Sequence, residues 1–205
     1  MTQRLWKFMS TVTTVMTTPV HNSLIQLGDT IDQAIGKLQS LLSVRTLRTV
    51  LTSPVTGGAS TTANFTLMTL TVPANRLQVG DVLEFTIHGR NTKTNSGGSV
   101  IEYWVSIGGT QCITLSFTPG TGITNQPFVV RGRIVVRSIG GSGALVCAAD
   151  ALSHTTATTV FPRTSAPTVN TRDTTTSLVV AVGGRYSSSN AGNLMTAEHG
   201  EICQI

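Results

Sequence analysis

The amino-acid sequence predicts a mainly β protein, a jelly-roll-like antiparallel β-sandwich preceded by an N-terminal arm and one short helix. The composition is rich in Thr, Ser and Gly, and 11% of the residues are charged, which favours strands and tight turns. Between residues 65 and 205, eight or nine short runs of alternating apolar and polar residues are separated by turn residues. A double-sheet jelly roll closes this number of strands with few free edges, and an immunoglobulin-like sandwich with fewer strands is the alternative.

Composition and periodicity divide the chain into four parts. These are an arm at 1–28, a coiled-coil-like helix at 29–43, a connector at 44–64 and the β domain at 65–205. The arm alternates like a strand near its middle, and the connector begins as a strand and ends in a cluster of Pro, Gly, Ser and Thr. A strand outside the main domain needs a partner edge, which either its own domain or another subunit would supply.

The helix has an amphipathic pattern. Asp29 or Thr30 is expected to cap its first turn, because a short side-chain oxygen accepts hydrogen bonds from the free amide groups there. Large aliphatic residues then recur at heptad spacing, at Ile31, Ile35, Leu38 and Leu42. A helix this short is marginal alone in water, so the seam must pack either on its own β domain or on copies of itself. Isoleucine at both kinds of seam position favours three strands over two.

The phrase GDTIDQAIGKLQSLL at residues 28–42 resembles a segment that recurs in fibres and other appendages of tailed bacteriophages. There it precedes a β-rich C-terminal module in a homotrimer. Residues 80–90 with 105–109, and residues 174–205, are also similar to β-rich domains near the ends of phage structural proteins. The resemblance implies a trimer seam along the helix and a virion anchor in the arm. The anchor residues would be Trp6, Phe8, Met9 and Val12.

Nine strands are expected in the β domain: 65–72, 82–89, 99–107, 112–117, 128–137, 144–149, 155–161, 177–182 and 201–205. The strand at 128–137 is the longest. Its alternation puts Arg131, Arg133 and Arg137 on one face. Gly132, Ile134 and Val136 take the other face.

Charge and cysteine usage exclude several classes of function. The net charge of +5 is spread along the chain, whereas nucleic-acid binding needs a dense basic stripe, usually with aromatic residues. Cys112, Cys147 and Cys203 are isolated, which predicts free thiols and no metal, as in a reducing cytoplasm. No apolar run approaches the ~20 residues of a membrane span, and the N-terminus is expected to stay uncleaved.

No catalytic constellation follows from the spacing of the polar residues. Asp81 with Glu84, and Asp150 with His154, are acid or acid–base pairs without a nucleophile beside them. Glu102 lies in a strand with two aromatic residues and lacks a second acid for glycoside hydrolysis. The histidines at 88 and 199 each stand alone and are expected to be structural. We therefore expect no enzyme activity, cofactor or metal.

The sequence is thus expected to be a structural virion protein of a tailed phage, a homotrimeric fibre or spike on head or tail, assembled in the host cytoplasm. Its partners would be itself, other virion proteins (capsid, portal, neck or tail) and a host-surface glycan. The alternatives are a capsid decoration or cement protein and a carbohydrate-binding module. Contact loops are expected at 91–98, 119–125 and 187–193. The ligand residues proposed at this stage are Asn91, Lys93, Asn95, Tyr103 and Trp104.

Overall fold

The computed structural model describes residues 30–32, 47–94, 99–119, 122–156 and 158–205. The chain forms two compact units, Met1–Thr46 and Leu47–Ile205. In the first unit, Ile31 and Asp32 are helical, directly after Thr30, as the capping pattern predicts. The proposed anchor residues Trp6, Phe8, Met9 and Val12, the seam residues Ile35, Leu38 and Leu42, and Asn95 lie outside the described residues.

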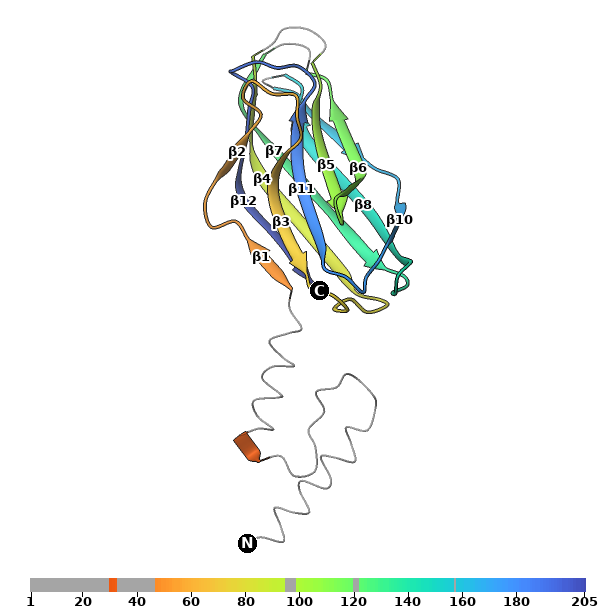
Figure 1. Cartoon of the computed structure of the whole chain (residues 1–205). Coiled ribbons are helices and arrows are strands. Elements are labelled where there is room, and N and C mark those ends of the chain that lie inside the picture. The colour runs from red at the N-terminus through yellow and green to blue at the C-terminus, as the bar shows by residue number, and fades with distance from the viewer. Residues whose placement is uncertain (1–29, 33–46, 95–98, 120–121, 157) are drawn as a thin grey trace. The chain divides into compact units, whose positions relative to one another are not determined.

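Twelve strands make up the described part of the second unit (Figure 1). They are β1 (Arg48–Val50), β2 (Val55–Gly57), β3 (Phe65–Val72), β4 (Val82–Lys93), β5 (Ile101–Ile107), β6 (Thr110–Phe117), β7 (Ile123–Val136), β8 (Gly143–His154), β9 (Val160–Thr164), β10 (Thr168–Arg172), β11 (Leu178–Tyr186) and β12 (Leu194–Gln204). The expected mainly β fold with antiparallel sheets is confirmed.

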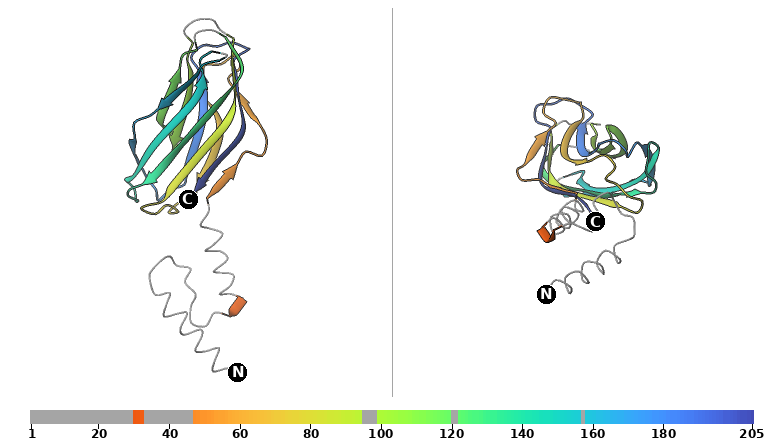
Figure 2. Two further views of the ribbon diagram at one scale, coloured as in Figure 1. Left: turned by 180° about the vertical axis from the view of Figure 1, so that it is seen from behind. Right: turned by 60° about the horizontal axis from the view of Figure 1, so that its bottom comes forward.

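The strands form two antiparallel sheets, which Figure 2 shows as two layers. The larger sheet has the order β1-β12-β4-β7-β8-β10; β2 also pairs with β12, and β9 also pairs with β8. The smaller sheet has the order β3-β11-β5-β6. Among the described strands, three hairpins, β5–β6, β7–β8 and β8–β9, join neighbours within a sheet. Along these strands the chain passes from one sheet to the other six times: between β2 and β3, β3 and β4, β4 and β5, β6 and β7, β10 and β11, and β11 and β12.

One apolar core fills the space between the sheets. Along β4, Leu83, Phe85 and Ile87 point inward and are at most 1% exposed, whereas the residues between them point outward. The smaller sheet contributes residues such as Val105 and Val182 to the same cluster. Each fully buried aliphatic side chain contributes roughly 1.5–3 kcal/mol to the free energy of folding. Alternation along many short strands places such side chains between the sheets, and their burial holds the two layers together.

The sequence located the long strands better than the short ones. The strand at 65–72 is confirmed in full, and the longest strand is β7, as expected. Strands β4, β7 and β8 each continue into residues that were predicted as loop. The expected connector at 44–64 contributes β1 and β2, because both pair with β12. Strand β10 was not predicted; its alternation is interrupted by Asn and Thr, and β8 determines its position.

A buried polar cluster joins the two layers. The side-chain amide of Asn91 in β4 donates to the Tyr103 hydroxyl at 2.7 Å and to Ser153 Oγ at 3.0 Å. Tyr103 belongs to β5 in the smaller sheet, and Ser153 to β8 in the larger one. All three side chains are at most 1% exposed, and burial raises the pKa of Tyr103 well above its usual range. The cluster pairs the Asn91 amide nitrogen with both hydroxyls, whereas the buried Asn91 Oδ1 has no hydrogen-bond partner in the described structure.

Tyr103→Phe should lower the free energy of unfolding by about 1–3 kcal/mol, because the amide of Asn91 loses a buried acceptor while the ring packing is kept. Urea denaturation followed by intrinsic fluorescence measures the change. Thr69→Ser, at an exposed position of β3, is the control and should leave the midpoint of urea denaturation unchanged. An unchanged midpoint for Tyr103→Phe would show that the hydroxyl adds nothing to inter-sheet cohesion.

Candidate functional site

Four of the predicted ligand residues are buried; they are Asn91, Lys93, Tyr103 and Trp104, each at most 6% exposed. Asn91 and Tyr103 belong to the polar cluster between the sheets. The Lys93 ammonium donates to the carbonyl of Pro119 at 3.1 Å, and burial lowers its pKa. Asn91 and Lys93 face inward at the end of β4. From the sequence, both were predicted to lie in a polar loop, because Asn and Lys are seldom buried in a protein core.

Trp104 lies on the outer face of the smaller sheet and is nevertheless only 6% exposed. Its indole packs over Gly183 in β11, where a Cβ atom would come within 2.2 Å of the ring. The indole N–H donates to the carbonyl of Gly184 at 3.1 Å. A glycine pair opposite an aromatic residue is the signal that could have predicted this packing. The ring covers backbone, so its face is not available to a sugar.

The predicted loop at 187–193 is described in full and is held against its neighbours. The Asn190 side chain accepts from Thr94 Oγ1 at 2.8 Å, and Asn193 Oδ1 accepts from the Thr94 backbone amide at 3.1 Å. The Ser187 hydroxyl accepts from the amide of Val100 at 2.7 Å. These hydrogen bonds tie the loop to Thr94 and Val100 of the neighbouring segments.

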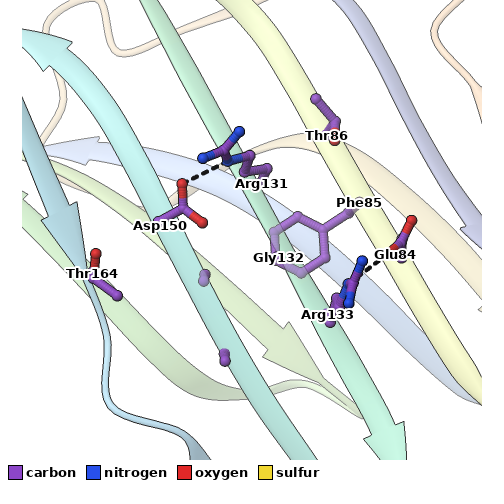
Figure 3. A pocket seen from close by; sticks show the side chains of 10 residues that line it. Glu84, Phe85, Thr86, Arg131, Gly132, Arg133, Asp150 and Thr164 are labelled. Carbon is purple, nitrogen blue, oxygen red and sulfur yellow. Dashed lines mark hydrogen bonds and ion pairs between the residues drawn. The ribbon is translucent and has the colours of Figure 1, made fainter.

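The outer face of the larger sheet carries an open hollow of about 460 Å³. It spans β4, β7 and β8, whose register places Phe85, Gly132 and Ala149 in one cross-strand row. That row forms the floor, because Gly132 has no side chain and the Phe85 ring lies beside it on the inner side (Figure 3). The hollow is lined by Glu84, Phe85, Thr86, Arg131, Gly132, Arg133, Ala148, Ala149, Asp150 and Thr164.

Two ion pairs flank this floor (Figure 3). Arg131 Nε lies 2.7 Å from Asp150 Oδ2, and Arg133 Nε lies 2.5 Å from Glu84 Oε1. Both pairs join directly opposite residues of neighbouring strands, the geometry in which opposite charges stabilise a sheet. The four charges cancel, so the hollow presents donors and acceptors without a net charge. It suits a neutral polar ligand better than an anion.

The acidic residues considered for catalysis are engaged elsewhere in the described structure. Besides Glu84 and Asp150, Glu102 accepts from Arg185 Nε at 2.6 Å. Asp81 accepts from the backbone amide of Gln78 at 2.8 Å in the turn before β4. His154 contacts the carbonyl of Thr156 at 3.3 Å. The arrangement brings neither predicted acid pair together around a nucleophile.

The three cysteines are free thiols. A hydrogen bond with Cys112 and burial raise the pKa of Cys147, so its thiol stays protonated in the core. Burial and the neighbouring Glu201 raise the pKa of Cys203. The pKa of Cys112 is lowered, chiefly by the same contact with Cys147.

Arg133→Ala should lower the free energy of unfolding by at most about 1 kcal/mol, because exposed ion pairs contribute roughly 0.2–1 kcal/mol. The Arg133 side chain is 69% exposed, and that of Glu84 is 32% exposed. A double-mutant cycle with Glu84→Ala, measured by thermal unfolding at low and high salt, isolates the pair. A coupling that salt leaves unchanged would contradict the screened surface pair described here.

Comparison with known proteins finds no matching family model and no match among curated proteins. No helix in the described residues has the length and apolarity needed to cross a membrane. The structure itself defines the class of protein as a two-layer antiparallel β domain with a neutral, ion-paired hollow on its larger sheet.

Proposed function

We propose that this protein is a structural subunit of a tailed-phage virion, a homotrimeric fibre or spike that displays the β domain. In this proposal residues 1–28 anchor the chain to the particle, and the helix at 29–43 forms the trimer seam. The β domain is presented outward, with attachment to a host-surface glycan as its second task. The partners are other copies of the chain and other virion proteins.

The observation that carries the proposal is the exposure of the first seam residue. Ile31 is helical and 55% exposed, and it belongs to a compact unit of its own at the N-terminal end of the chain. A large aliphatic side chain in water gains about 1.5–3 kcal/mol when a neighbour covers it. The resemblance of residues 28–42 to phage appendage segments supplies that neighbour as a second copy of the helix.

The jelly-roll-like arrangement belongs to this proposal as the finer description of the β domain. Its eight long strands divide into four from each sheet, which is the division that a jelly roll has. The order β12-β4-β7-β8 also places the last strand of the chain beside β4, so that the strand is not left at an edge of the sheet.

A capsid decoration protein is the alternative within the same particle. Its trimer would seal junctions between capsomers rather than project from the virion. A long arm lying on the capsid favours this role, and a narrow attachment with a projecting β domain favours a fibre. Imaging of labelled particles distinguishes the two.

A carbohydrate-binding module is the third candidate, and the neutral hollow on the larger sheet is the observation that favours it. Hydroxyl groups of a sugar would bind between Arg131–Asp150 and Arg133–Glu84. A glycan array probed with the purified full chain tests this function. Strong binding that Arg131→Ala removes supports a module, and no binding leaves assembly as the role.

The full chain should elute as a trimer, with a mass about three times that of one chain by light scattering coupled to gel filtration. Deletion of residues 1–20 should preserve the trimer and abolish loading onto particles. A monomer at micromolar concentration would remove the seam from the proposal. Normal incorporation of the shortened chain would remove the anchor.

A further inference from the structure

Two histidines that are far apart in the sequence, His88 and His199, form a pair on the outer face of the larger sheet. His88 in β4 lies directly opposite His199 in β12, and their ring centroids are 5.9 Å apart. Both side chains are exposed. The expectation that each histidine stands alone is therefore wrong, because the strand order β12-β4 places the last strand of the domain beside its fourth.

A β-bulge brings the second imidazole to this face. In β12, Met195 and Ala197 point inward, so continued alternation would also point residue 199 into the core. The register shifts between Ala197 and His199, so that Glu198 is the extra residue and His199 faces outward. Bulges of this kind aim a side chain at the cost of one interrupted step in the ladder, and they are frequent beside functional sites.

We propose that His88 and His199 form a chelating site for a divalent late first-row transition metal ion. Directly opposite residues of an antiparallel pair have Cβ atoms about 4.5–5.5 Å apart, so two imidazoles at such positions reach one ion. Imidazole nitrogen is a preferred ligand of Zn²⁺, Ni²⁺ and Cu²⁺. Exposed side chains change rotamer freely, so the rings close on the ion without movement of the backbone.

The surroundings determine how strong and how selective the site is. Glu198 is engaged with Arg90, whose Nε lies 3.2 Å from its carboxylate, and the described residues hold no cluster of three or more metal-ligating side chains. Water therefore completes the coordination, and the affinity is moderate. Mg²⁺ and Ca²⁺, which prefer oxygen ligands, should not bind.

Titration of the full chain with NiCl2 by isothermal calorimetry tests the site. One ion per chain should bind in the micromolar range, and the melting temperature should rise with nickel concentration. His88→Gln or His199→Gln should weaken binding roughly 100-fold, because a bivalent ligand loses its second contact. Acidification should release the ion, since a protonated imidazole cannot ligate it.

Matched controls locate the binding. His154→Gln removes a third histidine from the same sheet, and Cys203→Ser removes the partly exposed thiol of β12; both variants should bind nickel as the unaltered chain does. Unchanged affinity in the His88→Gln, His199→Gln double variant would overturn the proposal, and so would the absence of binding to the unaltered chain. Circular dichroism verifies that each variant is folded.

Discussion

Gly132→Val should destabilise the β domain by about 3 kcal/mol, the upper end of the range for overpacking a core. A Cβ atom at this position would lie 2.3 Å from the carbonyl oxygen of Ala148 and 2.5 Å from the Phe85 ring. The ring has no room to turn away in a filled core, and the carbonyl is backbone of the neighbouring strand β8. In a domain of this size the loss corresponds to a fall in melting temperature of about 6–12 °C.

The matched control is Gly141→Ala in the turn between β7 and β8, where a Cβ atom would meet nothing within 4 Å. We expect its effect to stay within about 0.5 kcal/mol. Urea and thermal unfolding of the full chain measure both variants. Equal stability of the two would mean that β7 and β8 do not approach each other as closely as described, and that the floor of the hollow is adaptable.

Alternation of apolar and polar residues was sufficient to predict most of the β domain. The strand Phe65–Val72 was located in full, and the division of β7 into an arginine face and a buried face followed from its period of two. These features depend only on residues that are close together in the sequence, so the sequence is sufficient to predict them. The same signal is weak in β10, where pairing with β8 rather than local pattern sets the strand.

The candidate sites were harder to predict because they depend on contacts between distant residues. Tyr103 and Trp104 resemble ligand-binding aromatic residues in sequence, yet one hydrogen bonds inside the core and the other covers Gly183. The pairing of His88 with His199 needs both the strand order and a bulge of one residue. In the sequence, the only signal of the Trp104 packing is the glycine pair at 183–184, and the only signal of the histidine pair is the interrupted alternation in β12.

The ion pairs of the hollow also depend on contacts between residues that are distant in the sequence. Arg131 and Arg133 were correctly placed on one outer face, but their partners Asp150 and Glu84 come from two different neighbouring strands. This pairing explains how a basic chain can present a neutral hollow, because the acidic residues of β4 and β8 form ion pairs with the arginines of β7. Net charge alone therefore says little about what this face would bind.

Ile35→Asp with Leu38→Asp should convert the proposed trimer to monomers while the β domain stays folded. Each chain would lose the burial of two aliphatic side chains, about 3–6 kcal/mol, and six carboxylates would be brought together at the seam. Gln33→Asp with Ser40→Asp adds the same charges at the outermost heptad positions, so this control should remain trimeric. Light scattering coupled to gel filtration measures the mass, and circular dichroism the fold. A trimer of undiminished mass in the seam variant would show that the β domains associate without the helix, and would leave the exposed Ile31 without a role in assembly.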